Sequence, residues 1–480
     1  MSSRRIVVVG ASEAGCQIAL EAQAAGHQVT LVDEHPQAMK DMSFDAPWFY
    51  GAALPAALMN DNSIAQSVLE ASPQLMECLE AGIDLRVSTI LWGAFRNGPN
   101  CVHVGTPRVG LVTREDNEML EHDALIITTG VRDFVPSFKG WELPGVLGGK
   151  AALALIDLYQ VFEGERLLVL GSSELAMRVV RAALARGVTV TGVVEPGDSV
   201  VAGPEATQFL AEHNIPVHLG HVISEATGKT EVKGAKLVSL DGKESAEIAC
   251  DTIAVAIATL PNIELPAAMG CRMRYEPALA SWLPEISVQG ETSLDGVFWL
   301  AAATGADEAM RSAILARIDG AAEDRRPAPL PEPAFNATDY IKRWIRALHE
   351  TGGDDVILCQ CETVSRAEFC GITPPRYLEK GLRHPQTPLV HSDDNSAPCL
   401  NQDFVKRMTR VSMGHCQGKR CRDEAAFTLS QRFGIGLETI RPASYRFPLR
   451  PIDLGLIADN DETDEIRLNW QMWPYETRQS

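Results

Sequence analysis

The chain has 480 residues, of which 45% are hydrophobic and 22% are charged. This length and apolar content predict roughly two to four globular domains and exclude a wholly disordered chain. The 43 Lys and Arg against 63 Asp and Glu give a net charge of −20, which argues against a nucleic-acid partner because phosphate backbones bind clustered positive charge. Apolar runs such as Ile6–Val9 are too short to span a bilayer, and a first strand at Ile6 leaves no room for a signal peptide. We therefore expect a cytoplasmic protein, with any membrane association peripheral and made through a complex.

Residues 4–34 predict a strand, a Gly-rich turn, a helix and a second strand. The apolar run Ile6–Val9 is typical of a buried parallel strand, and the turn Gly10–Gly15 leads into an Ala-rich helix. The second strand, His27–Val32, ends at Asp33 and Glu34, where a carboxylate is placed to bond a ribose hydroxyl. This order predicts the βαβ unit of a dinucleotide-binding domain.

The small residues of this turn fit a dinucleotide site only in part. Such a site needs small residues where the backbone turns, approaches the pyrophosphate and packs against the sheet, and these positions hold Gly10, Ser12 and Gly15. Ser12 puts a side chain on the path of the pyrophosphate. Glu13 puts a carboxylate at the helix N-terminus, where it competes with phosphate for the helix dipole. A bound nucleotide and a cleft that has lost its ligand are therefore both compatible with the turn.

A second βαβ unit is predicted at residues 164–195, about 160 residues further along the chain. Its turn holds Gly171, Ser173 and Ala176, which is one glycine of three, and Glu174 repeats the acidic start of the helix. This pattern favours a packing domain over an NAD(P)H site. Further strands are expected at 122–130, which ends in Thr-Thr-Gly, at 251–262 and at 296–302, the last of which leads into a helix over 308–321.

The composition changes after this helix. Residues 324–333 form a Pro-rich linker, and residues 336–349 predict an amphipathic helix with Ile341, Trp344, Ile345 and Leu348 on one face. Residues 384–403 are interpreted as an inserted loop. The expected organisation is a first Rossmann-type domain at 1–145 plus 285–323, a second dinucleotide-type domain at 146–284, the linker and helix at 324–350, a Cys-rich domain at 351–436 and an irregular tail at 437–480.

The strongest local signal is a crowd of cysteines near the C-terminus. Of 11 Cys, six lie between Cys359 and Cys421. The close pairs Cys359/Cys361 and Cys416/Cys421 can supply four thiolates, and His415, Lys419 and Arg420 add positive charge that favours thiolates. Spacing and flanks favour a [2Fe–2S] cluster over a four-thiolate zinc site or two disulfides. Cys370, in a helix-like stretch, and Cys399, in the inserted loop, are expected bystanders.

Residues 1–350 contain no two cysteines within three positions of each other. This spacing excludes the close-spaced redox-active dithiol of disulfide reductases. No nucleophile elbow or phosphate P-loop is present in the sequence either.

The order of these motifs resembles a known family. After the two βαβ units come Pro-Asn-Ile-Glu-Leu at 261–265, Cys-x-Cys at 359–361, Gly-His-Cys-Gln-Gly-Lys-Arg-Cys at 414–421 and Arg-Pro-Ile-Asp-Leu-Gly at 450–455. The chain is similar to the α subunit of heteromeric flavin-dependent amino- and imino-acid dehydrogenases. That group includes octopine and nopaline oxidases, D-hydroxyproline dehydrogenase and hydrogen cyanide synthase, and it is related to the large subunit of heterotetrameric sarcosine oxidase.

The resemblance implies an α/β, two-dinucleotide-binding-domain flavoprotein fold followed by a small helical [2Fe–2S] domain like bacterioferritin-associated ferredoxin. It implies a flavin-containing β subunit of the D-amino-acid-oxidase type that oxidises the substrate, while this subunit transfers electrons and carries no catalytic acid or base. The family also offers two further components, which are FMN at the subunit interface and a small ferredoxin-like subunit. The implied cluster ligands are Cys359, Cys361, Cys416 and Cys421, and the implied FAD-binding residues are Gly10, Ser12, Ala14, Gly15, Asp33, Glu34, Thr129 and Gly130.

Three departures from the family pattern fall on the FAD cleft. Ser12 replaces the second glycine, Ala302-Ala303 stands where the family has the Gly-Asp that holds the ribityl chain, and residues 35–44 lack the usual Gly-Gly-Gln. FAD, another adenine nucleotide and an empty cleft are therefore all open. So are two rival functions, a structural subunit with a non-redox four-cysteine metal site and an NAD(P)H-dependent flavoprotein reductase.

Overall fold

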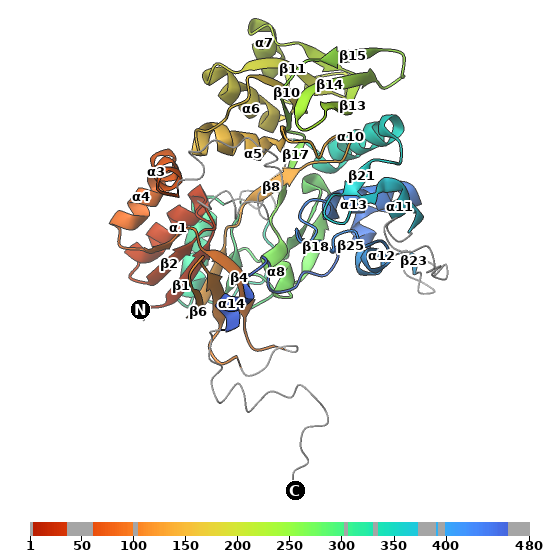
Figure 1. Cartoon of the computed structure of the whole chain (residues 1–480). Helices are drawn as coiled ribbons and strands as arrows, with labels where there is room; N and C mark the ends of the chain where they lie inside the picture. Colours follow the sequence, from red (N-terminus) through yellow and green to blue (C-terminus); the bar gives the residue numbers. More distant parts are fainter. Residues whose placement is uncertain are drawn as a thin grey trace.

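The computed structural model of the chain describes residues 3–35, 61–98, 104–301, 306–329, 335–372, 390–391 and 399–458 (Figure 1). The structure contains two nucleotide-type units and a Cys-rich region. The two units are connected by the paired strands β8 (Val131–Phe134) and β17 (Ala258–Pro261). Within the described ranges, no helix combines the length and the apolar character needed to cross a membrane.

The N-terminal unit is built on a five-stranded sheet with the order β20-β7-β1-β2-β3. All neighbouring strands pair in parallel. The strands are β1 (Arg5–Val9), β2 (Gln28–Val32), β3 (Asp84–Arg86), β7 (Ala124–Ile127) and β20 (Val297–Trp299). The central strand β1 is buried from Ile6 to Val9, as its continuous apolar run predicts.

Each face of this sheet is covered by a different layer. Ile6 and Val8 pack in a core with helices α1 (Glu13–Ala24), α3 (Asp61–Ala71), α4 (Pro73–Glu80) and α9 (Glu308–Ile318). Val7 and Val9 point to the other core, beneath the antiparallel sheet of β4 (Ile90–Phe95), β5 (Arg108–Val112) and β6 (Asn117–Glu121). The alternation along one strand therefore ties both layers to β1.

The second unit repeats the parallel architecture, with the strand order β12-β11-β10-β16-β9. Its strands are β9 (Val146–Gly148), β10 (Arg166–Leu170), β11 (Thr189–Glu195), β12 (Val217–Leu219) and β16 (Thr252–Val255). The helices are α5 (Gly149–Leu153), which continues as a π-helix over Ala154–Leu158, α6 (Glu174–Ala185) and α7 (Pro204–Glu212). An antiparallel sheet of β13 (His221–Gly228), β14 (Val232–Ser239) and β15 (Ser245–Ile248) completes the unit.

The chain returns from the second unit to the first earlier than residue 284, where the domain boundary was expected. The segment that follows β17 contains α8 (Glu264–Ala268), β18 (Met273–Glu276), a 3₁₀ turn at Pro277–Leu279 and β19 (Ser281–Pro284). Ile263, Leu265 and Leu283 are buried in the core of the first unit, together with Val7. The chain returns to the first unit already at β17, because β17 pairs antiparallel with β8.

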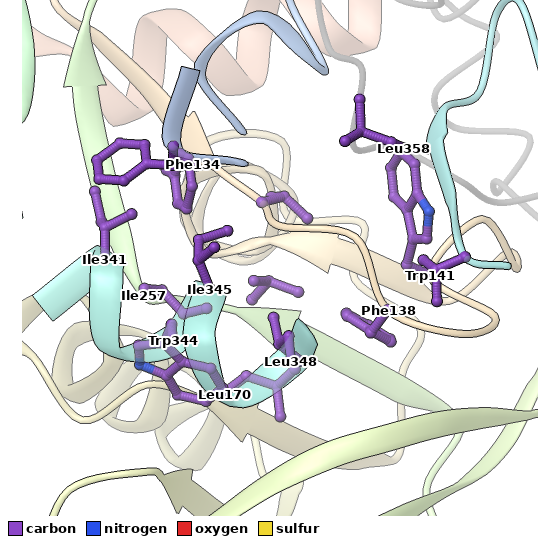
Figure 2. Close-up of a cluster of buried hydrophobic side chains, with 14 of the residues drawn as sticks. Phe134, Phe138, Trp141, Leu170, Ile257, Ile341, Trp344, Ile345, Leu348 and Leu358 are labelled. Atoms are coloured by element: carbon purple, nitrogen blue, oxygen red, sulfur yellow. The ribbon is translucent and has the colours of Figure 1, made fainter. Parts of the chain in front are cut away.

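Helix α10 (Ala337–Gly352) confirms the predicted amphipathic helix. Asn336 caps it by accepting a hydrogen bond from the Asp339 amide at 3.1 Å, and its predicted apolar face is buried. Figure 2 shows this face, Ile341, Trp344, Ile345 and Leu348, packed beside Leu170 and Ile257 of the second unit. The helix is therefore part of a core rather than an extension of the linker.

The Cys-rich region follows α10 and is built from short elements. They are β21 (Ile357–Cys359), β22 (Val364–Ser365), α11 (Arg366–Gly371), β23 (Val390–His391), β24 (Cys399–Asn401), α12 (Gln402–Thr409), α13 (Arg422–Phe433), a 3₁₀ turn at Leu437–Thr439 and β25 (Ile440–Arg441). The interpretation of residues 384–403 as a loop is wrong at its C-terminal end. β24 pairs with β23 and β25, Leu400 is fully buried, and Cys399 lies on a strand rather than in a loop.

The C-terminal segment is more ordered than the irregular tail that the sequence predicts. After β25 it crosses back to the first unit, where Leu449 is buried in the core and its amide donates to the Trp92 carbonyl at 2.8 Å. It ends in α14 (Leu454–Ala458), which Figure 1 shows beside β4 and β6. The last part of the predicted tail lies outside the described residues.

Candidate cofactor sites

The Gly-rich turn at the start of α1 has the close approaches that a nucleotide turn requires. Gly10 adopts a φ of +106°, and a Cβ on it would lie 2.5 Å from the Thr128 carbonyl oxygen. A Cβ on Gly15 would lie 2.1 Å from the carbonyl oxygen of Gly10. The first glycine therefore permits the turn, and the last one lets the helix pack against it.

The two residues that depart from the nucleotide pattern have distinct positions. Ser12 is the N-cap of α1, since its Oγ accepts a hydrogen bond from the Gly15 amide at 3.2 Å, and it lines the cavity beside the turn. Glu13 is exposed and does not line that cavity, and its carboxylate accepts from Gln17 Nε2 at 3.5 Å. The predicted competition between Glu13 and phosphate is therefore not supported by its position.

The two carboxylates at the end of β2 have different partners. Asp33 accepts from the Ala11 amide at 2.6 Å and from the His35 amide at 2.7 Å. Burial raises the pKa of Asp33, but the hydrogen bonds and charge of His35 outweigh burial and lower it below its ordinary value. Glu34 instead lies against Arg450 of the C-terminal segment, with Arg450 Nε 3.2 Å from Oε2.

A cavity of about 310 Å³ joins these groups at the carboxyl edge of the first sheet. Most of the predicted FAD-binding residues line it, namely Gly10, Ser12, Asp33, Glu34, Thr129 and Gly130. Gly15 supports the turn from behind, and neither Ala14 nor Gly15 lines the cavity. The structure therefore brings both strand ends and the turn together at one site, as expected for a doubly wound sheet.

The cavity is also lined by residues that the sequence analysis did not assign to it. Asn262 Nδ2 donates to the Thr129 carbonyl at 2.8 Å, and Lys150 Nζ donates to the Val131 carbonyl at 2.8 Å. Glu264, Leu449 and Arg450 also line the cavity. Asn262, Glu264 and Arg450 lie in the motifs at 261–265 and 450–455. The sequence therefore singled out these segments but did not indicate that they line the cavity.

Two of the predicted departures cannot be placed. Ala302 and Ala303 lie outside the described residues, and so does the segment after His35. The described residues suit the adenosine diphosphate part of a dinucleotide, since they provide the glycine turn, a carboxylate at the end of β2 and a cation at Lys150.

The second nucleotide-type turn is filled by the chain itself. Glu195, at the end of β11, is fully buried and accepts from Ser172 Oγ at 2.6 Å, from Tyr340 OH at 2.7 Å and from the Gly197 amide at 2.9 Å. The Tyr340 hydroxyl also accepts from the Ser172 amide at 3.2 Å. Helix α10 thus occupies the carboxyl edge where a second nucleotide would approach, which supports the interpretation as a packing domain.

We therefore expect NADPH and NADH to leave the thermal stability unchanged beyond any effect exerted through the first cleft. A ligand at about 100 times its Kd adds about 2.7 kcal/mol of stability, so binding is visible as a shift in Tm. The measurement is the Tm in thermal scans with each nucleotide, with and without excess ADP. A Tm increase by NADPH that ADP does not suppress would show that the second cleft opens.

The four predicted cluster cysteines are brought together in two pairs. Cys421 Sγ lies 3.6 Å from Cys359 Sγ, and Cys361 and Cys416 are in hydrogen-bond contact. All four are free thiols, so the disulfide alternative is not found in the structure. Cys359, Cys416 and Cys421 are buried, whereas Cys361 is partly exposed.

The loop around Cys416 has a backbone that allows Cys416 to approach Cys361 closely. A Cβ on Gly414 would lie 2.4 Å from Cβ of Cys361, so only glycine lets the two loops meet. The amides of Gly418 and Arg420 donate to the Cys416 sulfur, and the hydrogen bond from Cys361 lowers the pKa of Cys416 to about 5 despite burial. His415 Nε2 lies 3.5 Å from the Cys361 sulfur. The Cys416 thiolate is therefore stabilised chiefly by the Cys361 thiol and by backbone amides, with Arg420 as a smaller contribution, whereas the pKa of Cys361 is raised.

In the described ranges, no three or more His, Cys, Asp or Glu side chains converge on one metal position. Two pairs of thiols are the arrangement that the structure contains, and Cys370, in α11, belongs to neither pair.

A buried set of charges connects the cavity to the Cys-rich region. Arg132 lies 3.2 Å from Glu264, which lines the cavity, and 2.6 Å from Asp423, two residues after Cys421. Burial raises the pKa of Glu264, but Arg132 and other nearby cations outweigh burial and lower it to about 2. Glu424 accepts from the Ser137 amide at 3.0 Å. These contacts fix the start of α13 against the strand that leaves the cavity.

The spacing of the cysteines in the sequence did not predict one pair of thiols that meet in the first unit. Cys16 and Cys78 are far apart in the sequence but are in hydrogen-bond contact, and Cys78 Sγ lies 3.8 Å from the Cys16 carbonyl. Both are buried in the apolar core between α1 and α4. Their burial separates them from the accessible dithiol that disulfide reductases use.

Comparison with known proteins defines the class of the chain. The pyridine nucleotide-disulphide oxidoreductase family matches residues 4–320, so the chain belongs to this family of oxidoreductases. The two nucleotide-type units are the part of the fold that the match covers. This confirms the predicted two-dinucleotide-domain fold.

Among full-length relatives, the A-type component of opine oxidase from Rhizobium meliloti is 21% identical over 487 residues, which cover 95% of this chain and 88% of the relative. The HcnB component of hydrogen cyanide synthase from Pseudomonas protegens is 24% identical over 522 residues, with 95% of this chain and 98% of the relative covered. The alpha subunit of sarcosine oxidase from Corynebacterium is 22% identical, with 94% of this chain but 45% of the relative covered. These relatives confirm the resemblance found from the motifs.

The solved structures agree at the level of the fold. L-proline dehydrogenase from P. horikoshii superposes with a TM-score of 0.58 at 18% identity, and the match covers 95% of this chain and 80% of that protein. Since this match extends over nearly the whole chain, it includes the region that follows the two nucleotide-type units.

Proposed function

We propose that this chain is the electron-transfer subunit of a heteromeric flavin-dependent dehydrogenase. A partner subunit of the D-amino-acid-oxidase type oxidises the C–N bond of an amino acid, imino acid or opine. The relatives support this assignment, because they are named as subunits of opine oxidase, hydrogen cyanide synthase and sarcosine oxidase.

The observation that carries the proposal is the pairing of the four thiols. Cys359 with Cys421 and Cys361 with Cys416 would hold the two irons of a [2Fe–2S] cluster. Two thiolates at 2.3 Å from one tetrahedral metal are about 3.8 Å apart, close to the 3.6 Å between Cys359 and Cys421. Such a cluster accepts and releases single electrons. The protein's part is to supply thiolates, to direct the amides of Gly418 and Arg420 at one sulfur, and to keep three of the four sulfurs from water.

The first cleft is proposed to hold FAD through its adenosine diphosphate part. Gly10 and Gly15 would let the backbone and helix approach the ligand, Glu34 would bind the ribose, and Lys150 would balance phosphate charge. Asp33 is already engaged by the turn, which leaves Glu34 as the carboxylate for the ligand. FAD supplies two-electron chemistry when bound. FMN at the subunit interface and a ferredoxin-like subunit belong to the same proposal.

Gly15→Ala is expected to weaken FAD or ADP binding by at least about tenfold, because the added Cβ meets the Gly10 carbonyl and displaces the turn. The measurement is flavin content after purification, with calorimetric titration of ADP. Gly98→Ala, in the same unit, is the matched control, since nothing lies within 4 Å of its Cβ position and its backbone is outside the left-handed region. Equal affinities of the two variants would contradict the placement of the nucleotide at this turn.

Metal and flavin analysis of the complex tests the proposed function directly. The chain is purified anaerobically with its flavin-containing partner, the subunits are separated, and iron, acid-labile sulfide, zinc and flavin are measured on each. About two irons and two sulfides per chain are expected. A chain that contains zinc or no metal, in a complex that still oxidises amine substrates, would be a structural subunit.

A further inference from the structure

The C-terminal segment touches both candidate cofactor sites within two residues. The Leu449 carbonyl accepts from Lys419 Nζ at 3.0 Å, and Lys419 lies in the loop between Cys416 and Cys421. The next residue, Arg450, lines the nucleotide cavity. Because Leu449 is buried in the core of the first unit and its amide is bonded to Trp92, the position of Arg450 is fixed by its neighbour.

Arg450 holds the carboxylate of Glu34 at two points. Its Nε lies 3.2 Å from Oε2 and its Nη2 lies 3.4 Å from Oε1. The side chains are 18% and 28% exposed, so the pair is partly shielded from water at the cavity wall. A planar guanidinium that meets both oxygens fixes the plane of the carboxylate, which a lysine ammonium cannot do.

Glu34 needs such a partner because the cavity wall is rich in carboxylates. Asp33, Glu34 and Glu264 all line the cavity, and Asp33 is engaged by the turn. Lys150 and Arg450 are the lysine and arginine among the lining residues. Without Arg450, the Glu34 carboxylate would lose the cation that it meets, whereas Glu264 would keep Arg132 and Asp33 would keep its hydrogen bonds from the turn and from His35.

We propose that Arg450 is a positioning residue of the nucleotide cleft, which orients Glu34 to receive the free 2′-hydroxyl of an adenosine ribose. This inference rests on the proposed function of the cleft. The ligand class is an adenine nucleotide without a 2′-phosphate, because a 2′-phosphate would be placed against the Glu34 carboxylate. The C-terminal segment thereby completes a site whose other residues come from the first 265 positions of the chain.

Binding of two probes to the purified complex, ADP and 2′,5′-ADP, tests the proposal by calorimetry. The flavin is first removed, and iron content is recorded for every variant. The variants are Arg450→Gln, Arg450→Lys, Glu34→Gln and the double variant. Arg446→Gln is the matched control, since it removes the same charge from an exposed position of the same segment.

The wild type is expected to prefer ADP over 2′,5′-ADP. Arg450→Gln should weaken ADP binding about tenfold, the scale of one charge-assisted hydrogen bond, and Arg450→Lys should restore only part of it. In the Glu34→Gln background the further effect of Arg450→Gln should vanish, because Arg450 acts through Glu34. Arg446→Gln should behave as the wild type.

An equal loss from Arg450→Gln in both backgrounds would overturn the positioning role, and so would ADP binding unchanged by Arg450→Gln. A wild type that prefers 2′,5′-ADP would overturn the ligand class. If the wild type binds neither probe, the nucleotide cleft itself is refuted and this inference with it, whereas iron content reports separately on the cysteine site.

Discussion

Cys359→Ser and Cys416→Ser are each expected to abolish the iron and sulfide of the chain and to lower electron transfer to an external acceptor by at least about 100-fold. Each variant removes one member of a different thiol pair, so each leaves one iron with a single thiolate. Loss of groups that only support metal ligands already costs about 10- to 100-fold, and loss of a ligand costs more. The measurement is iron, sulfide and amine-dependent dye reduction in the purified complex.

Cys370→Ser is the control for these variants. Cys370 lies in the same region, on α11, and belongs to neither pair. It is expected to retain iron, sulfide and activity. Iron retained at the wild-type level in Cys359→Ser or Cys416→Ser would contradict the assigned ligand set, and equal losses in Cys370→Ser would point to general unfolding of the region.

Trp344→Ala is expected to lower the free energy of unfolding by about 3–5 kcal/mol, the usual cost of deleting a buried large aromatic side chain. Trp344 is fully buried where α10 meets the second unit, beside Leu170 and Ile257 (Figure 2). The cavity left behind would loosen the helix that carries Tyr340. Chemical denaturation followed by circular dichroism measures the change.

Arg346→Ala is the matched control for Trp344→Ala, because Arg346 is exposed on the opposite side of the same helix. It is expected to change the stability by less than about 0.5 kcal/mol. A small effect of Trp344→Ala, similar to that of Arg346→Ala, would show that α10 is not held in the second unit.

Local patterns were sufficient to predict the parallel strands, the glycine turn and the amphipathic helix. The run Ile6–Val9 is buried on both faces, Gly10 and Gly15 make the close contacts of a nucleotide turn, and the apolar face of α10 is buried as the 3.6-residue period indicates. These features depend on residues near one another in the sequence, where spacing carries the physical constraint.

Features that depend on distant segments were not predictable in the same way. The motif at 450–455 was recognised, but nothing in its spacing indicates that Arg450 meets Glu34, more than 400 residues earlier. The contact of Cys16 with Cys78 and the hydrogen bond from Tyr340 to Glu195 also join residues that are far apart in the sequence. The strand at Cys399–Asn401 was not predicted because the polar sequence before it shows no alternation of apolar and polar residues. The strand is defined in the structure by its pairing with β25.

The relation between the two cofactor sites follows from the same tertiary contacts. Arg132 links the cavity wall to Asp423 after Cys421, and the C-terminal segment links Lys419 to Arg450. Two independent connections therefore hold the cysteine site against the nucleotide cleft. Under the proposed function, these contacts would keep the cluster and the nucleotide at a fixed separation.

The most direct test of that role is electron paramagnetic resonance of the anaerobic complex after addition of amine substrates. A panel of an opine, sarcosine and D-proline is mixed with the wild-type complex and with the Cys416→Ser complex. A reduced [2Fe–2S] signal is expected in the wild type with an active substrate, and no such signal is expected in the variant although the partner flavin is bleached. Full bleaching of the partner flavin with no cluster signal in the wild type would contradict electron transfer through this chain.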